Sequence, residues 1–163
     1  MKKVLFSAFV TILIAGCSKD DELGCDNVVN TSGVDQTQLT KDLTIIDAFL
    51  SENDISAIEH ESGLRYVVDI QGEGNSPEIC GEVLVKYEGR LLANNSVFDS
   101  SNSAAFPLNN LILGWQVGFS QLKKGETATL YIPSGLAYGT SGAGSDIPAN
   151  ANLIFDVELI DFR

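Results

Sequence analysis

Residues 83–89 read Val-Leu-Val-Lys-Tyr-Glu-Gly, and the alternation within this stretch decides the fold class. Val83, Val85 and Tyr87 fall on one side of an extended chain, because successive side chains of a β-strand point to opposite faces. The intervening leucine, lysine and glutamate fall on the other side, which is typical of a half-buried strand. Gly89 is predicted to end this strand.

The same period of two recurs on both sides of this stretch, at residues 64–70, 128–132 and 153–159. A single short helix is predicted over residues 114–122, and the Lys-Lys-Gly sequence at 123–125 is expected to stop it. Several strands with one short helix between them predict an α+β domain, in which an antiparallel sheet wraps around the helix.

A helical pattern precedes the β-rich part. Over residues 35–51 apolar side chains recur at the spacing of one helix face, namely Leu39, Leu43, Ile46, Phe49 and Leu50. We expect this helix to dock on the following domain, and a dimerisation helix is the alternative. Residues 52–62 are polar and connect the helix onward. Residues 35–62 are therefore interpreted as a helical extension and residues 63–163 as the β-rich domain.

The first seventeen residues predict export and a lipid anchor. Two lysines are followed by an apolar run at residues 4–14, which is too short to span a bilayer as a helix, and then by small residues before Cys17. This order resembles the lipobox of bacterial lipoproteins, which implies a signal peptide at 1–16 and acylation of Cys17. An ordinary signal peptide with a chance cysteine is the alternative. Acyl chains would hold the protein on the membrane, since each buried CH₂ contributes about 0.8 kcal/mol.

The residues that follow suit a tether. Residues 17–34 are polar and are expected to be flexible. Within them, the sequence Ser-Lys-Asp-Asp-Glu at 18–22 resembles the surface-export tag of some Gram-negative lipoproteins, and a solvated tether is the alternative interpretation. We therefore expect a location in the bacterial cell envelope, anchored to the outer membrane, with the protein facing either the periplasm or the outside.

Composition and single residues exclude several functions. The net charge of −12 opposes binding to nucleic acid and adsorption to anionic lipid. The one histidine, His60, lies between two glutamates and is expected to be solvated, so no Ser-His or Cys-His pair is predicted for hydrolysis. No spacing of ligands suggests a metal, and no cofactor is expected. An exported compartment permits a disulfide, which Cys25 and Cys80 could form.

Three segments carry a family resemblance. Their order and spacing agree with the predicted strands. The first segment reads KYEGRL at 86–91 with VFDSS at 97–101, and the second reads FPL at 106–108 with LILGWQVG at 111–118. The third reads AYG at 137–139 with IP at 147–148 and NLIFDVEL at 152–159. Together they resemble the FKBP-type peptidyl-prolyl isomerases over about residues 62–163. This resemblance implies a sheet of roughly five antiparallel strands curled around one helix, with an aromatic pocket between them.

The resemblance also implies roles for individual residues. Trp115 would form the floor under a proline ring, and the other residues assigned to catalysis would be Phe98, Asp99 and Tyr138. The residues assigned to substrate binding would be Tyr87, Phe106, Leu111, Ile112, Ile147 and Phe155. The Ile112 N–H and the Tyr138 hydroxyl would donate hydrogen bonds to substrate carbonyls, and Asp99 would be the polar group at the edge. The implied partners are proline-containing segments of exported proteins and macrolide-type inhibitors.

This set of residues suits the chemistry of amide rotation. The barrier to rotation, about 18–20 kcal/mol, comes from the double-bond character of the C–N bond. An apolar pocket with well-placed donors favours the twisted transition state and needs no nucleophile or metal. Only six residues separate Asp99 from Phe106, fewer than in the family, and no arginine lies among them. A binding module or holdase chaperone with weak isomerase activity is therefore the alternative.

Overall fold

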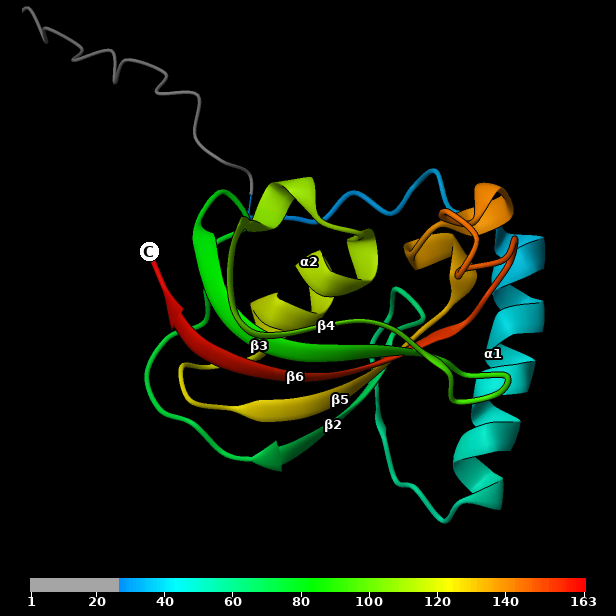
Figure 1. Ribbon diagram of the computed structural model, residues 1–163, viewed down its shortest axis with the longest axis horizontal. Coiled ribbons are helices and arrows are strands. Elements are labelled where there is room, and N and C mark those ends of the chain that lie inside the picture. Colours follow the sequence, from blue (N-terminus) through cyan, green and yellow to red (C-terminus); the bar gives the residue numbers. More distant parts are fainter. Residues whose placement is uncertain (1–26) are drawn as a thin grey trace, which may run out of the picture.

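The strands expected from the alternating pattern are present in the computed structural model, which describes residues 27–163. These residues form one sheet in which all neighbours are antiparallel, in the order β1-β2-β5-β6-β3-β4 (Figure 1). The strands are β1 (Ile58–Glu59), β2 (Arg65–Ile70), β3 (Glu82–Leu91), β4 (Val97–Pro107), β5 (Thr127–Ile132) and β6 (Leu153–Phe162).

The main core lies between the sheet and α2 (Leu113–Gln121), the short helix predicted from the sequence. Figure 1 shows α2 lying across one face of the sheet. Leu64, Phe119 and Leu130 are fully buried between these elements. Gly114 permits the close approach, because a Cβ there would lie 2.4 Å from Cγ2 of Ile132. The α+β prediction is confirmed.

The helix of the N-terminal extension is α1 (Gln36–Glu52), and it packs on the same domain. Asp35 caps it, with its Oδ1 accepting hydrogen bonds from the backbone N–H groups of Thr37 at 2.8 Å and Gln38 at 3.1 Å. Further along the helix, buried apolar side chains join a second cluster that consists of Ile46, Leu50, Leu92, Tyr131 and Ile154. Side chains alternate along β5 and β6, so this cluster lies on the face opposite α2. The extension therefore covers part of the second face of the sheet.

Three details of the strands differ from the sequence prediction. β3 continues through Gly89 to Leu91, and β4 is a continuous strand of 11 residues in a stretch for which no strand was predicted. β1 adds a sixth strand inside the stretch interpreted as a polar connection. Gly89 does not end a strand because its role is to make room: a Cβ there would lie 2.6 Å from the ring of Phe155 and 2.7 Å from that of Phe98.

The histidine is also less exposed than its acidic neighbours suggested. His60 is half-buried, and its Nδ1 accepts a hydrogen bond from the Ser62 N–H at 3.1 Å. The Gly63 N–H in turn donates to the His60 carbonyl at 2.9 Å, so the residue stabilises a tight turn before β2. Among residues 27–163, no group of His, Cys, Asp and Glu is arranged to hold a metal, and no helix has the length and apolar character needed to cross a membrane.

Candidate active site

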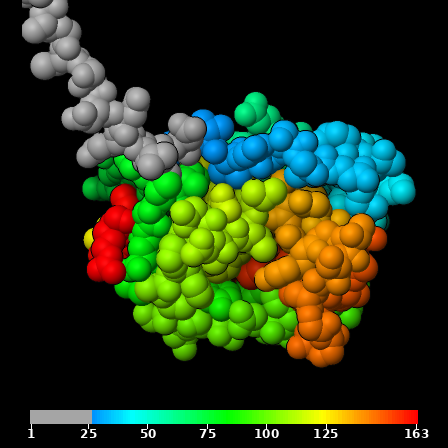
Figure 2. Space-filling model, turned by 90° about the horizontal axis from the view of Figure 1, so that it is seen from above, coloured from blue at the N-terminus to red at the C-terminus, as the bar shows by residue number. Residues whose placement is uncertain are grey.

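A cavity of about 230 Å³ opens between the sheet and the start of α2. Figure 2 shows this hollow between the yellow-green chain around α2 and the orange chain that follows β5. Its lining is mostly aromatic and consists of Tyr87, Phe98, Asp99, Phe106, Leu111, Ile112, Trp115, Tyr138 and Phe155. Nine of the ten pocket residues taken from the resemblance are thus brought together by the fold.

Trp115 forms the floor of the cavity and is only 4% exposed. Its ring meets those of Tyr87, Phe119 and Phe155, with centroids 5.1 Å away in each case and the planes steeply inclined. Edge-to-face pairs of this kind each contribute roughly 0.5–1.5 kcal/mol beyond the area they bury. The indole is therefore held rigidly from several sides. Its Nε1 is buried and has no hydrogen-bond partner among the described residues.

The walls come from three strands. Tyr87 lies on β3, Phe98 and Phe106 on β4, and Phe155 on β6. The rings of Phe98 and Phe155 pack edge to face with centroids 5.5 Å apart, over the space that Gly89 leaves open. The cavity is consequently a rigid apolar slot, of a size and character suited to a small aliphatic ring such as that of proline.

A carboxylate and a phenol are paired at the edge of the cavity. The Tyr87 hydroxyl donates a hydrogen bond to Oδ2 of Asp99 at 2.7 Å. Burial raises the pKa of Tyr87 to about 12, assisted by this hydrogen bond and by the negative charge of Asp99. The hydroxyl therefore remains a donor at neutral pH. The family resemblance assigned both residues to the pocket but did not reveal this pairing, which depends on the register between β3 and β4.

Two further donors face the cavity without an internal acceptor. The Tyr138 hydroxyl makes no hydrogen bond within the described residues, and its side chain is partly exposed. Burial and, secondarily, the charge of Asp99 raise the pKa of this phenol. Ile112 is the N-cap of α2, and its backbone N–H has no acceptor in the described part of the chain. Both groups are thus free to donate to carbonyl oxygens of a bound peptide.

Ile147 is the one predicted pocket residue that does not line the cavity. Its side chain is 7% exposed and belongs to the main core. Its backbone pairs with Ala143, with the Ala143 N–H donating to the Ile147 carbonyl at 2.8 Å and the reverse bond at 3.1 Å. This pairing closes the loop before Ile147 on itself and turns the isoleucine side chain into the core.

The cysteines can be placed only in part. Cys80 is disulfide-bonded. Cys17 and Cys25, the residues predicted to be lipidated and to pair with Cys80, lie outside the described residues. The lipid anchor and the Cys25–Cys80 bridge therefore remain predictions.

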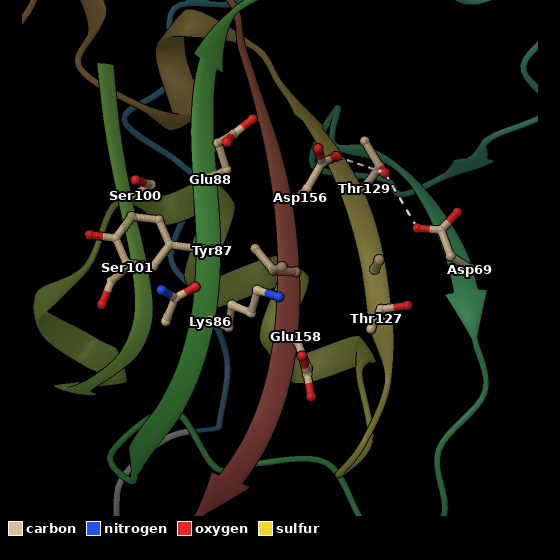
Figure 3. Close-up of a pocket in the computed structure, with 13 residues that line it drawn as sticks. Asp69, Lys86, Tyr87, Glu88, Ser100, Ser101, Thr127, Thr129, Asp156 and Glu158 are labelled. Atoms are coloured by element: carbon tan, nitrogen blue, oxygen red, sulfur yellow. Dashed lines mark hydrogen bonds between the residues drawn. The ribbon is translucent and has the colours of Figure 1, made fainter. Parts of the chain in front are cut away.

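A second and larger hollow, of about 480 Å³, lies on the opposite face of the sheet (Figure 3). Its side chains are mainly polar, and several bond to one another. The Thr129 hydroxyl donates to Asp156 at 3.0 Å and lies 3.4 Å from an oxygen of Asp69, while Asp156 also pairs with Arg90. Tyr87 is the one aromatic residue among the described residues that line it, so the smaller and mostly aromatic cavity is the better candidate for binding proline.

The β-rich domain is similar to several known proteins. The model of the family described as FKBP-type peptidyl-prolyl cis-trans isomerase matches residues 74–160, more than half of the chain. A probable FKBP-type isomerase, FkpA, from Neisseria meningitidis is 47% identical over 120 residues, covering 70% of this chain and 44% of the relative. The isomerase Mip from Coxiella burnetii is 45% identical over 106 residues, covering 63% of this chain and 46% of the relative.

Other relatives differ in how much of their length is matched. FK506-binding protein 1 from Dictyostelium discoideum is 40% identical over 107 residues, which cover 62% of this chain and 99% of that protein. The crystal structure of an isomerase from Pseudomonas syringae superposes with a TM-score of 0.69 at 30% identity, covering 78% of this chain and 94% of the other. The chain spans less than half the length of the Neisseria and Coxiella relatives.

Proposed function

The chain belongs to the FKBP-type peptidyl-prolyl cis-trans isomerase family, and from that premise we propose that it catalyses the cis-trans isomerisation of X-Pro peptide bonds. The observation that carries the proposal is the aromatic cavity floored by Trp115, with the Ile112 N–H and the Tyr138 hydroxyl free to donate at its rim. No residue in this cavity is arranged as a nucleophile, and amide rotation requires none.

The apolar cavity and the hydrogen-bond donors at its rim suit rotation about an X-Pro bond. A proline ring seated on Trp115 would lie against the packed rings of Phe98 and Phe155, away from water. Rotation removes the charge separation of the planar amide, so an apolar slot favours the twisted state over the planar one. Donors at the rim would hold the flanking carbonyls while the bond turns. Their fixed positions lower the entropy cost of reaching the twisted state.

The Tyr87–Asp99 pair is proposed to hold the edge of the slot in one conformation. The hydrogen bond to Tyr87 fixes the direction of the Asp99 carboxylate. A fixed negative group beside the reacting amide can interact with the carbonyl carbon or with a peptide N–H as the bond twists. Asp99 would therefore act electrostatically and would not transfer a proton.

For the whole protein, we propose a membrane-tethered isomerase that helps exported proteins past slow X-Pro steps, which take tens to hundreds of seconds unaided. The lysines, the short apolar run and the small residues before Cys17 support the lipid anchor in the bacterial envelope. The relatives named FkpA and Mip support the activity. Macrolide-type compounds would compete with proline for the same slot.

A second candidate function is a peptide-binding holdase with weak isomerase activity. The continuous β4 favours it, because this strand includes all six residues between Asp99 and Phe106 and leaves a long edge beside the cavity. Such an edge can pair with an extended polypeptide.

Assays on the full chain in detergent distinguish the two functions. If the protein is an isomerase, it should accelerate cis-to-trans conversion of a proline tetrapeptide in a saturable way. It should also speed the refolding of a protein whose folding rate is limited by prolyl isomerisation. No acceleration, combined with protection of an aggregating client at equimolar concentration, would favour the holdase. No effect in either assay would overturn both.

A further inference from the structure

The N-terminal extension contacts the chain segment that carries Tyr138. After β5 the chain makes the single turn η2 (Ser134–Leu136) and then reaches Tyr138, which lines the cavity. In Figures 1 and 2 the early turns of α1 lie beside this orange segment. Two side chains meet the segment at neighbouring residues: Val34, which directly precedes the extension, and Asp42 on α1.

Asp42 makes the polar part of this contact and is 1% exposed. Its Oδ2 accepts hydrogen bonds from the Ser134 N–H at 3.0 Å and the Ser134 hydroxyl at 2.6 Å, 92 residues further along the chain. Its Oδ1 accepts a bond from Nε2 of Gln38 at 2.8 Å. A buried carboxylate is costly unless it is hydrogen-bonded in this way. The contact with Ser134 therefore has one strongly preferred geometry.

The contact fixes the start of the segment that ends at Tyr138. The Ser134 N–H is also 3.0 Å from Oδ1 of Asn152, and the Ala137 N–H donates to the Ser134 carbonyl at 3.0 Å. Val34 packs so closely that a Cβ on Gly135 would lie 2.9 Å from its Cγ1. The Tyr138 side chain makes no hydrogen bond within residues 27–163. Its position therefore depends on how firmly the residues before it are held.

We propose that α1 acts as a clamp on the active site, and that Asp42 is a positioning residue which holds Tyr138 against the cavity through Ser134. The proposal rests on the proposed isomerase function and extends it by assigning a role to residues outside the aromatic cavity. The helical extension would then be part of the catalytic unit and would not serve as a spacer alone.

The test compares three carboxylate variants on the same helix, in the full chain. Asp42→Ala removes both bonds to Ser134 and should lower kcat/KM about tenfold, below the roughly 100-fold that a 1 Å misplacement can cost. Asp42→Asn keeps an oxygen facing Ser134, and Gln38 can turn its amide to match, so activity should return to within about twofold of the parent. Asp47→Ala is the matched control, because it breaks the ion pair with Arg65 at 3.0 Å, on the same helix, without touching Ser134.

A double-mutant cycle separates positioning from general stability. If Asp42 acts through Tyr138, Asp42→Ala should change kcat/KM less than twofold in a Tyr138→Ala background. Equal losses in both backgrounds, or equal losses in Asp42→Ala and Asp47→Ala, would overturn the clamp. Ser134→Ala keeps the carboxylate and serves as a milder variant if Asp42→Ala does not fold.

Hydrogen exchange tests the clamp independently of catalysis. The Ser134 and Ala137 amides should exchange at least tenfold faster in Asp42→Ala than in Asp47→Ala at matched global stability. Equal exchange would refute the clamp even in an active enzyme. If the parent chain shows no isomerase activity, the proposed function fails, and exchange at these amides still decides whether the helix holds the segment.

Discussion

Replacing Tyr87 with phenylalanine removes one oxygen and leaves the aromatic cavity otherwise intact. The ring keeps its contacts with Trp115 at 5.1 Å and with Phe106 at 6.2 Å. The hydrogen bond from the hydroxyl to Asp99, 2.7 Å long, is the interaction that disappears. The substitution therefore measures what this single hydrogen bond contributes to catalysis and to stability.

The structure sets the size of the expected effect. A hydrogen bond to a charged group contributes about 1.5–3 kcal/mol when it is desolvated. Asp99 is exposed to solvent, so we expect about 1 kcal/mol of stability and a fall in Tm of roughly 2–4 °C. A carboxylate no longer held in one direction should lower kcat/KM by about threefold to tenfold, equivalent to roughly 0.7–1.4 kcal/mol.

The pH dependence provides a second readout with a definite sign. The folded-state pKa of Tyr87 is about 12, above its ordinary value of 10.0, so folding favours the protonated phenol. The resulting stability is fully present below pH 10 and is lost as the pH rises through 12. Tyr87→Phe should therefore lose less stability than the parent between pH 10 and 12.

The assays are chemical denaturation across this pH range and kcat/KM on a proline tetrapeptide. Tyr66→Phe is the control, since Tyr66 is a largely buried residue outside the cavity whose hydroxyl makes no hydrogen bond among the described residues. Parent-like activity together with an unchanged alkaline profile in Tyr87→Phe would refute the role given to the Tyr87–Asp99 pair.

Three further predictions concern other parts of the chain. Gly89→Ala should cost about 1–3 kcal/mol and weaken proline binding, because the new Cβ meets two rings of the cavity at 2.6–2.7 Å; an unchanged melting curve would contradict this. Mass spectrometry of the membrane form should find acyl groups on an N-terminal Cys17, and an unmodified start elsewhere would exclude the anchor. Thiol titration of the unreduced, denatured protein should find neither Cys25 nor Cys80 free, and two reactive thiols would show that the bridge is absent.

The fold class could be predicted from the sequence because apolar and polar residues alternate clearly along most strands. The Lys-Lys-Gly sequence at 123–125 also marked the end of the short helix. The prediction that Gly89 ends a strand was wrong. Glycine commonly ends strands, but Gly89 lies inside β3 and leaves room for the rings of Phe98 and Phe155. β1 was missed because two exposed residues carry no detectable period. These errors arise from contacts between residues distant in sequence, which local patterns do not contain.

In the site, too, local motifs predicted which residues line the cavity but not the contacts between residues distant in the sequence. Nine of the ten residues assigned from motifs line one cavity, whereas Ile147 does not, because the loop before it closes on Ala143 and turns its side chain into the core. Their roles in binding and catalysis stay predictions. The bond between Tyr87 and Asp99 depends on strand register. The hydrogen bonds from Ser134 to Asp42 depend on where α1 docks. The helical pattern around Asp42 does not predict that this side chain is buried or that Ser134, 92 residues away, is its partner.

The cavity floored by Trp115 is proposed to catalyse prolyl isomerisation. The most direct test is kcat/KM of the full chain and of Trp115→Leu, measured on the same proline tetrapeptide at a temperature where both remain folded. We expect clear activity in the parent and a loss of at least about tenfold in the variant, equivalent to roughly 1.4 kcal/mol of transition-state stabilisation. Equal activity in the two folded proteins would show that catalysis takes place elsewhere.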